Sequence, residues 1–392
     1  MGLQTAPHTT HRFGLCGFSE CSELFAISRI SGEMTGSAIG FFFIALAFTI
    51  KHVSRKGANF GTVSRDSTHK QGKIRSPLTM NPMSKVAFLF PGQGSQYAGM
   101  GKLLAQTYTE ARETFEQADE TLGFALSQLC FEGPEEELRK TENTQPALLA
   151  VSVAAWRVLK AHGYQPDLVA GHSLGEYSAL VAAGSLSFAE ALQLVRKRGR
   201  YMQEAVPLGT GAMAAILKLP DGKLESILAD AAQGQVVAAA NFNSPDQVVI
   251  AGHAEAVERA MHLAKAAGAK RAIPLPVSAP FHCPLMRPAQ ERLKADLDAA
   301  LFRDLQVPLI NNWQAQIITR AEQAREGLFH QIPNPVRWTE SIRLMVEEGV
   351  TRFVEVGAGS VLMGLCRSIA PELSGAKFGE PSDLEKMKLL FA

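Results

Sequence analysis

The chain has 392 residues, of which 46% are hydrophobic, and a formal net charge of +1 at pH 7. This length and apolar content can bury a large core, and they predict one large domain with a smaller insert. The near-zero net charge argues against nucleic acid or an acidic membrane surface as a main partner.

The charge is unevenly distributed along the chain. Residues 1–82 hold nine Lys and Arg but only four Asp and Glu, a net charge of +5, which leaves −4 for residues 83–392. The five cysteines form no C-x-x-C pair and have no zinc-ligand spacing. The sequence therefore predicts no metal site and a reducing, cytoplasmic compartment.

Residues 1–82 form an extension with one prominent feature, the uncharged run 34–50, which is followed by Lys51 and Arg55. Seventeen residues are at the lower limit for spanning a bilayer, so an organelle-targeting or membrane-anchor segment is one interpretation. The alternative is a mis-assigned start, with the true start at Met83. The polar remainder of the extension has the composition of a disordered segment.

Residues 83–206 alternate between apolar strand-like runs and helical patterns. Ser187 is a predicted helix N-cap, because Glu190 lies three residues further on, the spacing of a capping box. The predicted strands are 86–90 and a run ending at Gly171, and the predicted helices are 98–107, 108–121, 144–162 and 187–202.

Residues 207–277 have a different pattern, in which four strands and two helices follow one another as βαββαβ. This order predicts a small ferredoxin-like subdomain inserted in the larger domain. The predicted strands are 211–217, 236–241, 247–251 and 271–277, and the predicted helices are 221–232 and 253–267.

Residues 278–392 return to alternating strands and helices, with strands at 307–312 and 352–356 and helices at 287–300 and 339–348. Such alternation predicts an α/β fold with a largely parallel sheet. We therefore expect an α/β-hydrolase-like large domain formed by residues 83–206 and 278–392.

The strongest local motif is Gly171-x-Ser173-x-Gly175, which lies between an apolar strand and a predicted helix. This is the pattern of a nucleophile elbow, a tight turn that presents a serine hydroxyl above the sheet. The turn also places the hydroxyl at a helix N-terminus, where backbone N–H groups can hold an oxyanion.

A serine hydroxyl is a weak nucleophile until a base accepts its proton. Among the histidines of residues 83–392, His282 is the best candidate, because Pro280 and Pro284 hold its loop extended. His172 adjoins the serine, but neighbours in a tight turn point apart, so His172 is predicted to brace the turn.

The helix over 187–202 carries four basic residues in its C-terminal half: Arg196, Lys197, Arg198 and Arg200. Basic side chains favour a helix C-terminus through the helix dipole and would then lie in solvent. One of them could instead point into the site and pair with an anionic substrate. The pattern alone leaves both interpretations open.

Four motifs together resemble, in order and spacing, the malonyl-CoA:acyl carrier protein transacylases. The similarity extends from about Ser84 to the C-terminus, and residues 1–82 have no counterpart. The motifs are Phe90-Pro91-Gly92-Gln93-Gly94-Ser95-Gln96, Gly171-His172-Ser173-Leu174-Gly175-Glu176, Ala279-Pro280-Phe281-His282 and Asn334-Pro335-Val336-Arg337-Trp338.

The resemblance implies a role for each matching residue. Ser173 would attack malonyl-CoA, with His282 as general base and then general acid. The resemblance further implies an oxyanion hole from the backbone N–H groups of Gln93 and Leu174. It assigns the malonyl carboxylate to Arg198.

Further roles follow from the same resemblance. Gln331 would orient His282 through its backbone carbonyl, in place of the acid of a serine-protease triad. Met202, Asn241 and Phe281 match positions that line the acyl pocket, and Phe281 fits the compact pocket that selects malonyl groups.

The implied reaction is ping-pong: malonyl-CoA acylates the serine, and the phosphopantetheine thiol of acyl carrier protein then takes the malonyl group. No cofactor is implied, and the expected protein is a cytoplasmic monomer. Fatty acid and polyketide synthesis remain alternative destinations for the product. A serine thioesterase or hydrolase, and a scaffold tethered to a membrane by residues 34–50, are the rival functions.

Overall fold

The computed structural model describes residues 84–277 and 279–392. The predicted extension 1–82, with its apolar run, lies outside the described residues.

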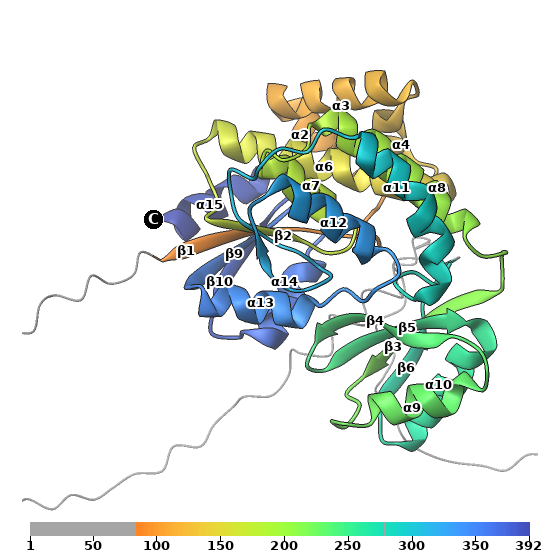
Figure 1. Cartoon of the computed structure of the whole chain (residues 1–392). Coiled ribbons are helices and arrows are strands. Elements are labelled where there is room, and N and C mark those ends of the chain that lie inside the picture. Colours follow the sequence, from red (N-terminus) through yellow and green to blue (C-terminus); the bar gives the residue numbers. More distant parts are fainter. Residues whose placement is uncertain (1–83, 278) are drawn as a thin grey trace, which may run out of the picture. The chain divides into compact units, whose positions relative to one another are not determined.

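The larger of two sheets has six strands in the order β10-β9-β1-β2-β7-β8 (Figure 1). Every neighbouring pair is parallel except β7 and β8, which are antiparallel. The predicted α/β fold with a largely parallel sheet is thus confirmed. The strands are β1 (Lys85–Phe90), β2 (Leu168–Gly171), β7 (Leu309–Ile310), β8 (Ile317–Ile318), β9 (Val350–Val356) and β10 (Ser374–Phe378).

Helices cover both faces of this sheet, and the alternation of side chains along β1 shows how. Phe88 and Phe90 belong to the main apolar core with α6 and α7, whereas Ala87 and Leu89 pack with α13 and α14 on the opposite face (Figure 1). The helices are α2 (Lys102–Thr107), α3 (Thr109–Leu122), α4 (Leu126–Glu132), α5 (Glu135–Leu138), α6 (Thr141–Ala161), α7 (Gly175–Ala182), α8 (Phe188–Glu204), α11 (Arg287–Ala299), α12 (Ala321–Gln331), α13 (Trp338–Glu347), α14 (Val361–Ile369) and α15 (Leu384–Phe391).

The second sheet has four antiparallel strands in the order β4-β5-β3-β6. Helices α9 and α10 pack on one of its faces, while Met213 and Val249 on the other face join the main core. The order of elements is the predicted βαββαβ. The bounds are β3 (Gly211–Leu217), α9 (Leu224–Ala232), β4 (Val237–Ser244), β5 (Gln247–His253), α10 (Ala254–Ala266) and β6 (Arg271–Pro274).

Several predicted elements are shorter than expected. The helix expected from residue 98 begins at Lys102, because Gly99 and Gly101 take φ of 106° and 77°. The strand expected over 307–312 is reduced to Leu309–Ile310. There the side chain of Asn311 accepts the N–H groups of Gln314 and Gln316 and turns the chain.

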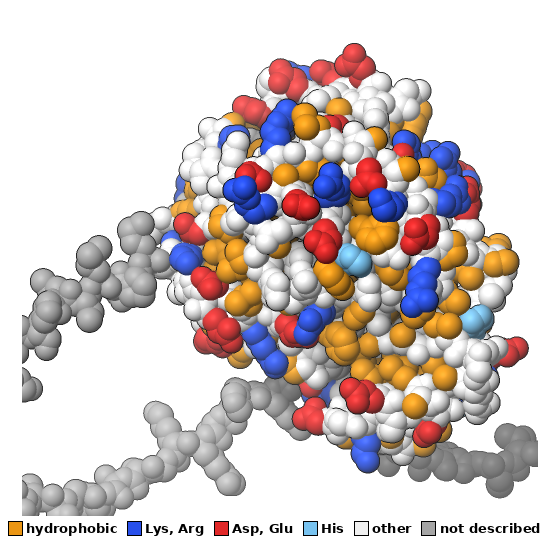
Figure 2. Space-filling view, viewed as in Figure 1, with side chains coloured by type: hydrophobic (Ala, Val, Ile, Leu, Met, Phe, Trp, Pro, Cys, Tyr) orange, Lys and Arg blue, Asp and Glu red, His pale blue; other side chains and the backbone are white. Residues whose placement is uncertain are grey.

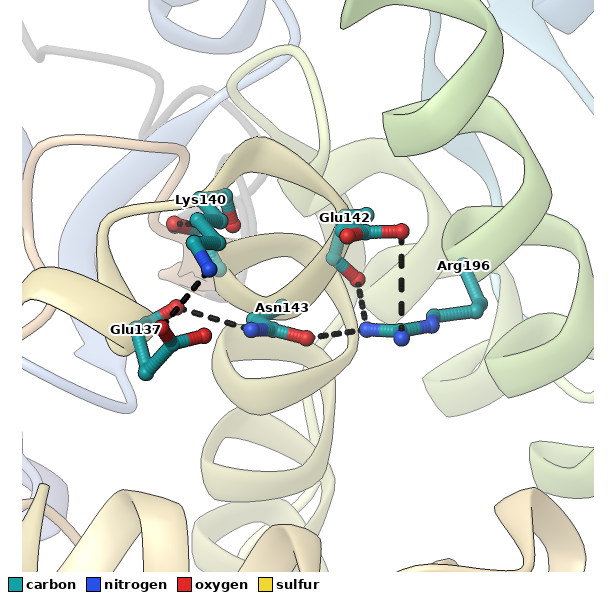
Figure 3. A network of polar contacts seen from close by, with 6 residues as sticks. Glu137, Lys140, Glu142, Asn143 and Arg196 are labelled. Carbon is teal, nitrogen blue, oxygen red and sulfur yellow. Dashed lines mark hydrogen bonds and ion pairs between the residues drawn. The ribbon is translucent and has the colours of Figure 1, made fainter. Parts of the chain in front are cut away.

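Helices α6 and α8 cross in close contact, and this contact fixes the position of α8, which carries Arg198. Gly199 on α8 permits it, because a Cβ there would lie 2.7 Å from the Cα of Glu142. Beside the crossing, Arg196 donates to the carbonyl of Glu142 over 2.9 Å and to the side chain of Asn143 (Figure 3). Asn143 in turn donates to the carbonyl of Glu137, so this polar network fixes the N-terminus of α6 against α8.

The face drawn in Figure 2 carries acidic and basic side chains interspersed with one another. No helix within residues 84–277 and 279–392 is both long and apolar enough to cross a membrane.

Candidate active site

Ser173 occupies the turn between β2 and α7, with a φ of 52°. The glycines on either side are sterically required. A Cβ on Gly171 would lie 1.9 Å from the carbonyl carbon of Gly175, and a Cβ on Gly175 would lie 2.0 Å from the carbonyl oxygen of Phe90. The strained backbone of the serine and these close approaches are those of a nucleophile elbow.

The hydroxyl of Ser173 meets the imidazole of His282. Its Oγ lies 2.6 Å from His282 Nε2, and His282 Nδ1 lies 3.0 Å from the carbonyl oxygen of Gln331. Because a carbonyl only accepts, the proton is on Nδ1, which leaves Nε2 free to accept the proton of the serine. The group that orients the imidazole is therefore a carbonyl and not a carboxylate.

Burial, and then the nearby Arg198 cation, lower the pKa of His282 from 6.5 to about 3. The side chain is 3% exposed. A histidine in this environment is neutral at physiological pH, which is the state a general base needs before it accepts a proton.

Arg198 is the basic residue of α8 that points into the site, and it is 1% exposed. Its Nη2 lies 3.2 Å from Ser173 Oγ and 2.9 Å from Gln331 Oε1, and its Nη1 donates to Gln145 Oε1 over 2.7 Å. Within the described residues it forms no ion pair with a carboxylate. A buried guanidinium beside the nucleophile is thus available to an anionic group.

The other basic residues of the same helix face elsewhere. Arg196 pairs with Glu142 and Lys197 pairs with Asp296, while Arg200 is exposed. The alternative that the sequence left open is resolved in favour of one inward residue.

The backbone N–H groups of Gln93 and Leu174 flank the serine turn. Leu174 precedes α7, and Gln93 follows β1 in the loop that packs on His172 through Gly92. Neither N–H donates to another residue in the described part of the chain. Two free N–H groups at this edge of the sheet fit the predicted oxyanion hole.

Of the remaining predicted residues, Met202, Asn241 and Phe281 are buried and His172 is half-buried. His172 donates from Nε2 to Asn243 Oδ1 over 2.9 Å and packs on Trp338, which fits the predicted bracing role. Met202 receives a contact from Gln145 Nε2 at 3.9 Å. Asn241 and Phe281 are 7% and 8% exposed, and their place in an acyl pocket remains a prediction.

Three buried polar residues of the site were not predicted: Gln145, Glu176 and Asn312. Asn312 accepts the N–H of Ser173 over 2.6 Å and donates to the carbonyl of Gly171, so it holds the turn from both sides. Two of them carried a signal in the sequence, since Gln145 directly precedes the apolar run 146–151 and Asn312 stands at the end of the predicted strand 307–312. A buried amide usually has a hydrogen-bond partner.

A family model described as "Acyl transferase domain" matches residues 87–372. The fold and the match together define the chain as an acyltransferase. The relatives are more specific. "Malonyl CoA-acyl carrier protein transacylase" of Escherichia coli (strain K12) is 52% identical over 301 residues, which is 76% of this chain and 97% of the relative. The protein of the same name from Bacillus subtilis (strain 168) is 51% identical over 77% of this chain and 96% of its own length.

Solved structures agree with the sequence relatives. An acyl carrier protein S-malonyltransferase from Vibrio cholerae is 50% identical and has a TM-score of 0.76, covering 78% of this chain and 100% of that one. A malonyl-transacylase in complex with its type II PKS acyl-carrier protein is also 50% identical, with a TM-score of 0.76 over 79% and 99% of the two chains. The chain belongs to the malonyl CoA-acyl carrier protein transacylase family.

Proposed function

We propose that this enzyme transfers the malonyl group of malonyl-CoA to the phosphopantetheine thiol of acyl carrier protein through a malonyl ester on Ser173. One observation carries the proposal. The hydroxyl of Ser173 contacts a neutral base, His282, and a buried guanidinium, Arg198, that has no carboxylate partner among the described residues.

In the first half-reaction, Ser173 Oγ attacks the thioester carbonyl while its proton passes to His282 Nε2. The negative charge that develops on the carbonyl oxygen is held by the N–H groups of Gln93 and Leu174. The tetrahedral intermediate then expels the CoA sulfur, which takes the proton from His282, and the serine is left as an ester.

In the second half-reaction the thiol of acyl carrier protein takes the place of CoA. His282 removes its proton, the sulfur attacks the ester carbonyl, and Ser173 leaves with the proton. A thioester is broken and a thioester is formed, so the reaction is reversible and needs no cofactor.

Arg198 supplies the specificity for a malonyl group. A malonyl carboxylate would form a charged hydrogen-bonded pair with the guanidinium, whereas an acetyl group would leave it unpaired. An unpaired buried polar group costs about 1–3 kcal/mol, and more for a charged group, which favours malonyl over acetyl.

The rival functions have less support. A serine hydrolase is expected to orient its histidine with a carboxylate, but the Nδ1 of His282 donates to the carbonyl of Gln331. A scaffold without catalysis would have no use for a strained serine in contact with a base. We propose a cytoplasmic monomer whose malonyl product serves fatty acid synthesis, with a polyketide pathway as the alternative.

The proposal is tested by the mass of the intact protein after incubation with malonyl-CoA. We expect the wild type to gain one malonyl group and to lose it when phosphopantetheinylated acyl carrier protein is added, and Ser173→Ala to gain none. Rapid hydrolysis of malonyl-CoA without acyl carrier protein would support the hydrolase instead.

The role of Arg198 has its own test. In Arg198→Ala we expect the rate of malonylation to fall at least tenfold and the preference for malonyl-CoA over acetyl-CoA to narrow. Arg200→Ala, which removes an exposed arginine from the same helix, is the control and should leave both unchanged. An unaltered preference in Arg198→Ala would refute the carboxylate contact.

A further inference from the structure

Glu176 is a buried carboxylate next to the serine turn for which the mechanism above has no use. It is 0% exposed and lies in the first turn of α7, three residues after Ser173. Burial raises the pKa of its carboxyl group to about 7, so a substantial fraction is ionised at neutral pH and most of it at pH 8. Burying a carboxylate costs free energy, so its presence at a reaction centre suggests a structural or functional role.

The carboxyl group of Glu176 is connected to the site through Gln331. Its Oε2 accepts from Gln331 Nε2 over 2.8 Å, and the other end of the same amide, Oε1, accepts from Arg198 Nη2 over 2.9 Å. One amide group therefore separates the anion from the cation. The N–H of Asn312 also donates to Glu176 Oε2, over 3.0 Å, and fixes the carboxyl group in place.

This chain of hydrogen bonds from Glu176 through Gln331 to Arg198, called the relay below, has an electrostatic consequence for Arg198. Glu176 is the carboxylate whose charge acts on the guanidinium, and the amide of Gln331 links it to Nη2, the same nitrogen that lies beside the serine hydroxyl. The Nε of Arg198 has no hydrogen-bond partner among the described residues, so part of the guanidinium stays available to substrate. A negative charge one amide away weakens the attraction of the guanidinium for a second carboxylate, and burial makes the effect larger than it would be in water.

We propose that Glu176 is a positioning residue that orients Arg198 through the amide of Gln331 and moderates the affinity of the site for an anionic acyl group. This inference rests on the proposed function, because it assumes that Arg198 receives the malonyl carboxylate. A weaker hold of Arg198 on the malonyl carboxylate favours the second half-reaction, because the malonyl group must leave the site on acyl carrier protein.

The test compares acylation of Ser173 by malonyl-CoA and acetyl-CoA supplied together at pH 8, read as the ratio of malonylated to acetylated protein in the first turnover. Glu176→Gln keeps an oxygen that can accept from Asn312 and Gln331 but removes the charge. We expect the malonyl-to-acetyl ratio to rise by about tenfold. Glu176→Asp, which keeps the charge, should retain the wild-type ratio within about twofold while the absolute rate falls.

Glu355 on β9 provides a matched control. It is also 0% exposed, burial also raises its pKa to about 7, and its two oxygens accept the N–H groups of Leu362 and Met363 at the start of α14. Glu355→Gln removes the same kind of buried charge without touching the relay. The malonyl-to-acetyl ratio should stay at the wild-type value.

The ratio does not depend on how much of the preparation is folded, because both acyl groups compete for the same folded molecules. A ratio in Glu176→Gln that is unchanged or lower would overturn the inference. So would loss of both acylations in Glu176→Gln while Glu355→Gln stays active, since Glu176 would then support the fold. If the wild type itself is not malonylated, the proposed function fails first.

Discussion

At the scale of single residues, the site depends on which groups carry protons. His282 is neutral because burial and the Arg198 cation oppose a second positive charge, and its hydrogen bond to a carbonyl keeps the remaining proton on Nδ1. His282 is thus unprotonated, and able to accept a proton, at a pH where an ordinary histidine would be partly protonated.

This arrangement predicts the pH dependence of the Ser173 nucleophile. Protonation of His282 removes the base, and its pKa is lowered from 6.5 to about 3, so reactivity is lost only as the pH falls far below 6.5. We expect the rate of labelling of Ser173 by a neutral fluorophosphonate to show no inflection attributable to His282 between pH 5 and pH 8. A neutral reagent is chosen because it avoids the charge of a malonyl group.

Arg198→Ala is the informative comparison for this profile. Without the guanidinium, one of the two largest causes of the lowered pKa of His282 is gone, so the acid limb should move to higher pH. A midpoint near 6.5 in the wild type would contradict the neutral base that the structure places beside Ser173.

At the scale of elements, the sequence predicted the helices and strands that residues close to one another in the chain determine. The strand before Ser173, the capped helix that begins after Ser187 and the βαββαβ order were all recognisable, because apolar periodicity and turn residues determine them nearby in the chain. Helix α12, which carries Gln331, was not predicted. Its Gly327 interrupts the pattern, and in the fold that glycine lies against Asn311 and Glu176.

The convergence of the site was not predictable from periodicity. Ser173 meets His282 across 109 positions and Arg198 meets Gln331 across 133, and no local pattern encodes such contacts. The resemblance to a family indicated these residues together. It gave no indication of Asn312 or Gln145, whose roles appear only when the hydrogen bonds of Ser173 and Arg198 are followed outward.

The crossing of α6 and α8 predicts the effect of a small change far from the chemistry. A methyl group on Gly199 would press on the backbone of Thr141 and Glu142, each at 2.7 Å, so the helices must separate. In Gly199→Ala we expect a net loss of about 1–2 kcal/mol in the free energy of unfolding, because overpacking outweighs the gain in helix propensity. Malonylation should also slow, since the neighbouring Arg198 moves away from Gln145.

Gly364→Ala on α14 is the matched control for urea unfolding. A Cβ there has no heavy atom within 4 Å beyond its own neighbourhood, so the same substitution should be neutral or stabilising by up to about 1 kcal/mol. Equal effects of the two substitutions would contradict the close crossing as the cause.

At the scale of the whole molecule, the described residues form one continuous structure around the site. The first strand begins at Lys85, and its Phe88 and Phe90 are fully buried in the main core. Every residue assigned a role in the transfer lies between Gln93 and Gln331. The relatives from Escherichia coli and Bacillus subtilis align over 97% and 96% of their lengths with about three quarters of this chain.

A chain that begins at Met83 should therefore keep both the fold and the activity. We expect its rate of Ser173 malonylation to match the full chain within about twofold, and its melting temperature to match within about 2 °C, a shift that corresponds to less than about 1 kcal/mol. A chain that begins at Gly92 is the control. It lacks β1, whose removal takes the central parallel pairings with β2 and β9 out of the sheet, and it should not fold. If the chain from Met83 folds but is malonylated more than tenfold more slowly, residues 1–82 contribute to the reaction. The statement that every residue with a role in the transfer lies within residues 93–331 would then be wrong.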